Sequence, residues 1–301
     1  MSTPLLRWVA AETGSLAALL EGQGLTSALA DGRVFVDGKR AAAELPLAVG
    51  TVVEVFAPRP SASITLLSDV DGVLAVHKPA ALPTEPDKSG ADSVLSQLAK
   101  LLHVEPGGLF ALSRLDVGVS GVLLVTLGSR SRERLLAERA AGRYARRYVA
   151  LACGVPSPVE GEWRDALGGA GQGKRAVGGV DAQQACSRYR VVARAAAVAP
   201  GAAPTSLIAL SPVTGRTHQL RVHCAAHGAP ILGDRKYQGP PRMTAPDGSV
   251  HAFAQILLHS AWVEWGSGAA RRRVAAEPAA ALVDGWLALG GELAALQRAL
   301  D

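Results

Sequence analysis

The order of strand-like and helical segments is the feature that most constrains the fold. Helical spacing of apolar residues occurs near 93–103 and 129–140, while runs typical of strands occur near 62–69, 72–78, 144–152, 184–194, 205–211 and 256–265. These segments are mixed without a regular βαβ rhythm, which predicts an α+β fold with a largely antiparallel sheet. The 301 residues, 49% of them hydrophobic, are enough for one large core and a small additional module.

A stretch punctuated by proline and serine, APRPSAS at 57–63, separates two patterned regions and is the best candidate for a linker. We therefore predict a small module at 1–59 and a large domain at 60–301. In the small module, LTSALADG is typical of a short helix that ends at Gly32. RVFVDGKR is typical of a hairpin that turns at Asp37–Gly38, and TVVEVF of another strand. The glycine- and alanine-rich stretches at 168–180 and 195–204 are expected to be mobile surface loops.

The charge of the chain favours an anionic partner. The formal net charge is +5 and the sequence pI is about 9.4. Positive charge is concentrated between 130 and 147, where seven arginines face only two acids, Glu133 and Glu138. Such a run suits the phosphates of nucleic acid, although a solvated helix face explains it equally well. We therefore state contacts between RNA and Arg143, Arg146 and Arg147 as a hypothesis, which depends on whether these side chains share one surface.

Cysteine usage and hydropathy exclude several classes of protein. Cys153, Cys186 and Cys224 are odd in number and widely spaced, which indicates neither a disulfide framework nor a CxxC metal site. No run of about eighteen apolar residues occurs, and the first residues lack the basic leader and apolar stretch of a secretory signal. We expect a cytoplasmic protein with no membrane partner, and a monomer.

Four short segments carry the chemistry. They are GVLAVHKPAALPTEP at 72–86, LSRLDVGVSGVLLVT at 112–126, GRYARRYVALACG at 142–154 and SPVTGRTHQLRVHCAAHGAPILGDRKY at 211–237. In the second segment, Arg114 and Asp116 lie in a turn between two apolar, strand-like stretches. An acid held between core strands is a candidate functional group. The structural alternative is a turn aspartate that caps local backbone groups.

The four segments, in this order, resemble the motifs of the RluA-type family of RNA pseudouridine synthases over about residues 62–265. The resemblance implies the pseudouridine-synthase fold, a long mixed and mostly antiparallel sheet with an active-site cleft across its middle. It also implies that Asp116 is the catalytic aspartate and that Arg221 pairs with it. Tyr148 matches the tyrosine that lies against the target base. The implied substrate-binding residues are Arg114, Arg216 and His218, and no cofactor or metal is implied.

The region 1–59 resembles the small RNA-binding module named after ribosomal protein S-four, through ADGRVFVDGKR and AVGTVVEVF. This resemblance implies a helix and hairpin module that contacts RNA. The helical segment ahead of the hairpin carries one arginine, where the family usually carries several basic residues.

The implied reaction breaks the bond from ribose carbon 1 to uracil nitrogen 1 and makes a new bond to uracil carbon 5. A carboxylate can attack the sugar carbon, attack the ring, or remove a sugar proton, and the sequence leaves these alternatives open. An arginine beside the carboxylate favours the anion and fixes its orientation. The target uridine must leave its stack, which costs a few kcal/mol. The expected substrates are uridines of structured ribosomal or transfer RNA.

Two other function classes remain as alternatives. One is an RNA-binding or ribosome-assembly protein on the same fold, for which catalysis is dispensable. The other is a metal-dependent hydrolase that uses His218, His223 and His227, but the spacing of five and four does not place all three on one helix face. We therefore expect no metal site.

This chain also departs from the family pattern beside the catalytic aspartate. Ser113 stands where histidine is usual, and Val117-Gly118-Val119 stands where a polar residue and a threonine are common. Contacts to RNA around the flipped uridine are therefore expected to differ from those of familiar members.

Overall fold

The computed structural model describes residues 6–30, 33–41, 45–55, 62–86, 92–195 and 203–301. The chain divides into two compact units, Met1–Ala62 with Pro86–Asp92, and Ser63–Glu85 with Ser93–Asp301. Residues 57–61 of the predicted linker lie outside the described residues, so the boundary between 59 and 60 stays a prediction. No helix in the described ranges is long and apolar enough to cross a membrane.

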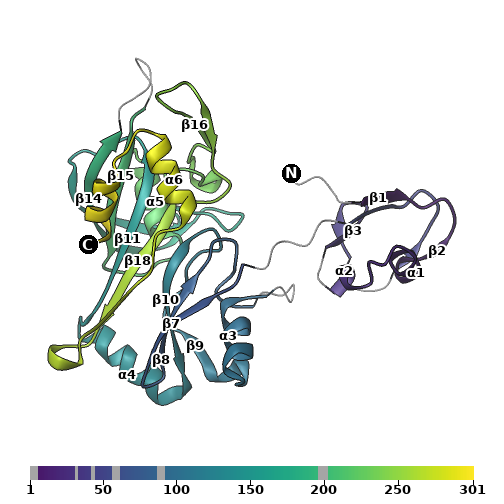
Figure 1. Ribbon diagram of the computed structural model, residues 1–301, viewed down its shortest axis with the longest axis horizontal. Coiled ribbons are helices and arrows are strands. Elements are labelled where there is room, and N and C mark those ends of the chain that lie inside the picture. Colours follow the sequence, from purple (N-terminus) through teal and green to yellow (C-terminus); the bar gives the residue numbers. More distant parts are fainter. Residues whose placement is uncertain (1–5, 31–32, 42–44, 56–61, 87–91, 196–202) are drawn as a thin grey trace. The chain divides into compact units, whose positions relative to one another are not determined.

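The first unit has a four-stranded antiparallel sheet, a separate pair of short strands and a helix that packs on them (Figure 1). Its strands are β1 (Leu6–Val9), β2 (Gly14–Ser15), β3 (Val34–Val36), β4 (Lys39–Arg40), β5 (Pro46–Leu47) and β6 (Val52–Val55), and its helices are α1 (Leu16–Gly22) and α2 (Ser27–Ala30). Leu16 and Leu20 of α1 bury their side chains with Val34 and Val53. The predicted hairpin turn is present at Asp37–Gly38, where both residues have positive φ, as a two-residue hairpin turn requires.

The second unit is built on a sheet of 11 strands. The strand order is β13-β12-β14-β15-β11-β18-β10-β8-β7, with β19 beside β18 and β9 beside β10. The bounds are β7 (Thr65–Val70), β8 (Val73–Lys78), β9 (Leu109–Ala111), β10 (Ser120–Leu127), β11 (Tyr144–Cys153), β12 (Glu160–Gly169), β13 (Arg175–Val177), β14 (Val180–Ala195), β15 (Thr205–Pro212), β18 (Leu258–Trp265) and β19 (Arg272–Ala275). A separate hairpin joins β16 (Arg242–Thr244) and β17 (Val250–Ala252).

One parallel contact, between β10 and β18, interrupts this otherwise antiparallel sheet. There Gly121 lies opposite Ser260, with a φ of +114°. A Cβ on Gly121 would overlap the backbone of Ser260, so only glycine fits this close approach. The loop that carries Asp116 leads directly into β10 and is therefore anchored at this junction.

Helices cover both faces of the sheet. They are α3 (Val94–Leu102), α4 (Gly128–Ala140), α5 (Gln219–Ala226), α6 (Ala280–Ala288) and α7 (Leu293–Leu300), with short turns η1 (Pro106–Gly108), η2 (Arg235–Tyr237) and η3 (Gly268–Ala270). The C-terminal helices, drawn in yellow in Figure 1, bury Trp286 and Leu296 against Val149 and Leu207 on one face. Helix α5 packs Val222 on the other face.

The predicted α+β class and mostly antiparallel sheet are confirmed, but one local prediction is wrong. The stretch 168–180 is not a loop: it contains the end of β12, all of β13 and the start of β14. Its glycines serve a close crossing, because a Cβ on Gly168 would overlap the backbone of Gly179. Residues 196–202 of the second predicted loop lie outside the described residues.

Candidate active site

Asp116 lies in the loop between β9 and β10, and the loop after β8 fixes its position. The Thr84 hydroxyl donates to the carbonyl of Leu115 (2.9 Å) and accepts from the Leu115 N–H (3.2 Å). The N–H of Ala81 donates to the carbonyl of Val117 at 2.7 Å. Asp116 is thus bracketed by residues whose main chain is held on both sides.

Lys78 joins the same two loops from inside the protein. Its side chain is fully buried, and its ammonium donates to the carbonyls of Pro79 (2.8 Å), Leu82 (2.7 Å) and Val117 (3.3 Å). Burial lowers the pKa of Lys78 to about 7, against the opposing attraction of Asp116. The ammonium therefore cross-links the KPAALP loop to the loop of the predicted catalytic residue.

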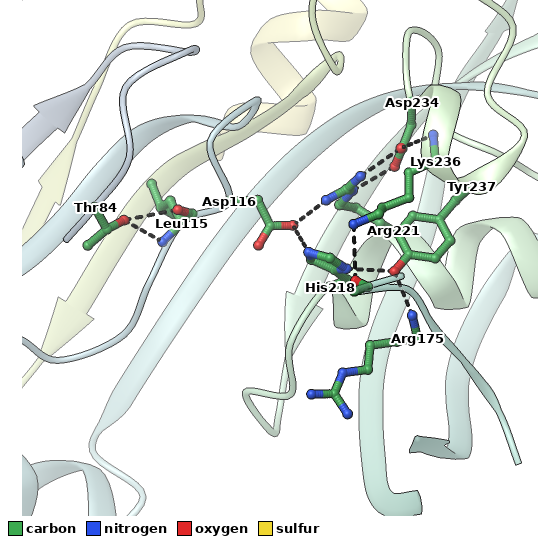
Figure 2. Close-up of polar contacts among 10 residues, drawn as sticks. Thr84, Leu115, Asp116, Arg175, His218, Arg221, Asp234, Lys236 and Tyr237 are labelled. Atoms are coloured by element: carbon green, nitrogen blue, oxygen red, sulfur yellow. Dashed lines mark hydrogen bonds and ion pairs between the residues drawn. The ribbon is translucent and has the colours of Figure 1, made fainter. Parts of the chain in front are cut away.

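Arg221 projects from α5 and contacts two carboxylates at once (Figure 2). Its Nη1 donates to Asp116 Oδ2 at 2.8 Å, while Nε and Nη2 donate to the two oxygens of Asp234, each at 2.7 Å. Arg221 and Asp234 are buried. Burial acts to lower the pKa of the Arg221 guanidinium, but the hydrogen bonds and charges of Asp234 and Asp116 outweigh it and raise that pKa. The guanidinium is therefore a fixed cation.

His218 approaches the same oxygen of the Asp116 carboxylate that Arg221 contacts. It precedes α5 with a φ of +59°, and its Nε2 lies 3.9 Å from Asp116 Oδ2. Its Nδ1 lies 2.6 Å from the Tyr237 hydroxyl, which also accepts from the N–H of Arg175 at 3.0 Å. Burial lowers the pKa of His218 below its ordinary value, against the attraction of Asp116. Burial therefore favours the neutral form of this imidazole.

A pocket of about 320 Å³ opens onto Asp116. Its lining includes all six residues singled out from the sequence: Arg114, Asp116, Tyr148, Arg216, His218 and Arg221. Tyr148 is buried on β11, and burial raises the pKa of its phenol. At the mouth, the exposed Arg114 approaches Glu85 at 3.9 Å, and Arg216 donates from Nε to the Gln184 carbonyl at 3.0 Å.

Some of the machinery around Asp116 was not assigned from the sequence. Asp234, Lys78, Thr84 and Tyr237 all hold site residues, as described above. All four fall inside the quoted motif segments, but the sequence does not show which residues they contact. Only the folded chain brings Asp234 and Asp116 to the same guanidinium.

The arginines between 130 and 147 do not form one surface. Arg146 is buried, lines the pocket and donates to the carbonyl of Thr214 at 3.0 Å. Arg143 instead pairs with Glu138 at 2.7 Å on the protein surface. Because side chains alternate along a strand, Arg147 projects from the face of the sheet opposite Arg146 and Tyr148.

The three histidines of the fourth motif have different partners. His218 contacts Tyr237, as above, while His223 Nδ1 lies 2.9 Å from the Ser187 hydroxyl. His227 Nε2 lies 2.8 Å from Asp165 Oδ2. Burial lowers the pKa of His223 to about 4, so this imidazole is neutral at pH 7.

Comparison with known proteins relates this site to RNA modification. Residues 72–226 match the family model described as RNA pseudouridylate synthase. The dual-specificity RNA pseudouridine synthase RluA of Escherichia coli K12 is 31% identical over 221 residues, covering 70% of this chain and 94% of that protein. RNA pseudouridine synthase 2 of Arabidopsis thaliana chloroplasts is 33% identical over 147 residues, covering 46% of this chain and 32% of that protein.

Solved structures show the same fold. Human RNA pseudouridylate synthase domain containing 1 superposes with a TM-score of 0.59 at 21% identity, covering 81% of this chain and 97% of that chain. Human RNA pseudouridylate synthase domain containing 4 superposes with a TM-score of 0.58 at 21% identity, covering 76% of this chain and 94% of that chain.

Proposed function

Because this chain belongs to the RNA pseudouridylate synthase family, whose enzymes isomerise uridine in RNA to pseudouridine, we propose that Asp116 is the carboxylate that starts the reaction. The observation that carries the proposal is that Asp116, held by Arg221, lines the same pocket as the buried Tyr148. The reaction is an isomerisation, so no group has to be imported or removed apart from protons.

The two oxygens of the Asp116 carboxylate have different surroundings. Within the described part of the chain, both Arg221 and His218 approach Oδ2, and no side-chain partner is present at Oδ1. We assign Oδ1 as the atom that attacks the substrate or takes its proton, because Oδ2 is already engaged. All three initial steps, on the sugar carbon, on the ring, or at a sugar proton, are compatible with this assignment.

Asp234 makes Arg221 a directed partner. A guanidinium that gives Nε and Nη2 to one carboxylate in a bidentate pair has its plane fixed, so that Nη1 points in one direction. That direction is toward Asp116 (Figure 2). We propose that Asp234 is a positioning residue, acting on the catalytic carboxylate through Arg221.

Tyr148 is proposed to lie against the uracil and to relay the proton that leaves carbon 5 after the new bond has formed. Burial raises the pKa of its phenol, so the hydroxyl remains protonated at neutral pH. A protonated hydroxyl can pass a proton on while it receives another, whereas a phenolate base is disfavoured in this position.

The proposed substrate is a uridine in structured ribosomal or transfer RNA, flipped into the pocket. Arg114 and Arg216 at the mouth supply charges for the neighbouring phosphates, which offset the cost of unstacking. The unit at the N-terminus is proposed to assist RNA binding, in line with the S-four resemblance of residues 1–59.

The test is tritium release from RNA labelled at uracil carbon 5, using wild type and Asp116→Asn. The wild type should release tritium and the variant should not, while both bind the RNA with similar affinity. A matched control is Asp284→Asn, which changes an exposed aspartate of α6. Undiminished release by Asp116→Asn would contradict the assignment of Asp116. A pseudouridine map of RNA from cells lacking the gene would then identify the modified position.

A further inference from the structure

The face of the sheet opposite the catalytic pocket carries a group of arginines around a tryptophan. On β11, Arg146 and Tyr148 line the pocket, so Arg147 between them projects from the other face. Further along the strand, Val149 on that same face is covered by the C-terminal helices. Across the sheet, Arg147 pairs with Trp262 of β18. Arg147 thus lies at the edge of the area that α6 and α7 cover, because its neighbour Trp262 packs against their core cluster.

Two more arginines converge on this point from other strands. The guanidinium of Arg273, on β19, lies 4.2 Å from the centre of the Trp262 ring, and that of Arg147 lies 5.7 Å from it. Arg190 of β14 pairs across the sheet with Ala209 of β15, and Ala209 pairs with Val149. Residues paired across a sheet point to the same face, so Arg190 projects from the same face as Val149 and Arg147. Burial, and then the charges of Arg190 and Arg273, lower the pKa of Arg147. The three cations therefore repel one another.

The acidic side chain opposite Arg273 across the sheet, Glu264, forms its ion pair with Arg271 at 2.7 Å. Within the described ranges, Arg147, Arg190 and Arg273 form no ion pair with an aspartate or glutamate side chain, and Arg273 donates only to the main-chain oxygen of Asp301 at 3.1 Å. The Nε of Arg147 and the Nε1 of Trp262 are buried N–H groups without a hydrogen-bond partner in the same part of the chain. Buried donors and converging cations are costly unless an anion meets them.

Two neighbouring arginines on this face do form ion pairs with an acidic side chain. Arg164 and Arg188 both pair with Glu162, which neutralises part of their charge. On this face of β11, β14 and β19, the described arginines that form no ion pair with an aspartate or glutamate side chain are Arg147, Arg190 and Arg273; together with Trp262 we call them the rear arginine cluster.

We infer that the rear arginine cluster binds phosphates of the substrate RNA, in a segment that passes behind the catalytic pocket. The inference rests on the proposed function, which makes RNA the polyanion that the protein meets. Guanidiniums stacked on an indole ring are held in orientation and keep their N–H groups free for bidentate contact with phosphate oxygens. An RNA that reaches this face must extend beyond the flipped uridine, so the cluster selects for large structured RNA over short hairpins.

The experiment removes two exposed members of the cluster and keeps Arg147, whose partial burial makes its replacement a risk to folding. The variant is Arg190→Gln with Arg273→Gln. Its matched control is Arg194→Gln, an exposed arginine of the same strand on the opposite face, since the adjacent Ala193–Leu207 pair packs beneath the C-terminal helices. Affinity is measured against salt with a fluorescein-labelled RNA duplex and with poly-glutamate, and KM is measured by tritium release from long and short RNA.

Loss of two phosphate contacts should weaken duplex binding by roughly tenfold and lower the salt slope by about 1 per contact. KM should rise for the long RNA and not for a short hairpin, and Arg194→Gln should match wild type. An unchanged salt slope overturns the inference, and so does a loss confined to poly-glutamate, which would indicate an acidic protein partner. If wild type releases no tritium but the duplex result holds, the proposed function fails and this site stands.

Discussion

Asp234 and Arg221 form a buried, two-pronged ion pair, and its geometry leaves one nitrogen of the guanidinium for Asp116. The pair joins Asp234, the residue just before η2, to Arg221 of α5. Both residues lie far from Asp116 in the sequence. Asp234, which does not line the pocket, thus orients the proposed catalytic carboxylate through Arg221.

Asp234→Asn is expected to lower kcat by roughly 10- to 100-fold, since a hydrogen bond to a charged group is worth about 1.5–3 kcal/mol and each tenfold in rate is about 1.4 kcal/mol. The amide can accept only one of the two donors, so Arg221 loses its fixed plane. Single-turnover tritium release measures the effect, with Asp284→Asn as the surface control. An unchanged kcat together with an intact melting temperature would show that Arg221 is oriented without Asp234.

Lys78 should give the protein a distinctive dependence of stability on pH. Burial lowers its pKa from 10.5 to about 7, so between these values the unfolded chain binds a proton that the folded chain does not. Stability therefore rises with pH across that window and is lost as pH falls through 7. The full effect is on the order of 5 kcal/mol at about 1.4 kcal/mol per pKa unit.

The comparison is with Lys78→Met, which keeps the shape of the side chain and removes its charge. Free energies of unfolding from urea titrations between pH 7 and pH 10 should rise more steeply for wild type than for the variant. Parallel curves would mean that Lys78 keeps its ordinary pKa despite its burial. Because the variant also loses the bond to the Val117 carbonyl, its kcat should fall as the loop of Asp116 loosens.

Much of this architecture follows from patterns that are local in the sequence. Alternation along β11 places Arg146 and Tyr148 on one face and Arg147 on the other, and that alternation is readable from the letters alone. The sequence does not show which face of the sheet holds the pocket, because that depends on where α5 packs. The sequence therefore shows Arg146 and Arg147 only as neighbours in one basic run, although the fold places them on opposite faces of the sheet.

Other features could not be predicted from the sequence, because they depend on contacts between residues that are distant in the sequence. The role of Asp234 depends on its sharing a guanidinium with Asp116, and no spacing rule relates these positions. The glycines at 168 and 179 have the composition of a loop, yet they permit two strands to approach closely. The four motif segments all contribute to the lining of the pocket, through the loops beside β8 and β10, through β11, and through the loop and first turn of α5.

Tyr148→Phe separates stacking from proton transfer. The ring remains to lie against the uracil, so RNA affinity should be unchanged, but the relay through the hydroxyl is lost. Release of tritium from carbon 5 should slow by roughly 10²- to 10⁴-fold, the usual contribution of a positioned acid or base. Deuterium at carbon 5 should then produce a kinetic isotope effect that the wild type lacks. Normal release by Tyr148→Phe would assign the proton to another acceptor and leave Tyr148 with stacking alone.

Gly121→Ala tests the parallel junction that anchors the loop of Asp116. A Cβ at this position would overlap the main chain of Ser260, and the φ of +114° is one that alanine rarely adopts. Backbone strain of this kind costs about 1–3 kcal/mol before the overlap is counted, so we expect a loss of at least about 3 kcal/mol in the free energy of unfolding. Gly107→Ala is the matched control, because open space surrounds Gly107. Equal unfolding curves for the two variants would mean that β10 and β18 can separate at Gly121 without cost, and that the junction does not hold the catalytic loop.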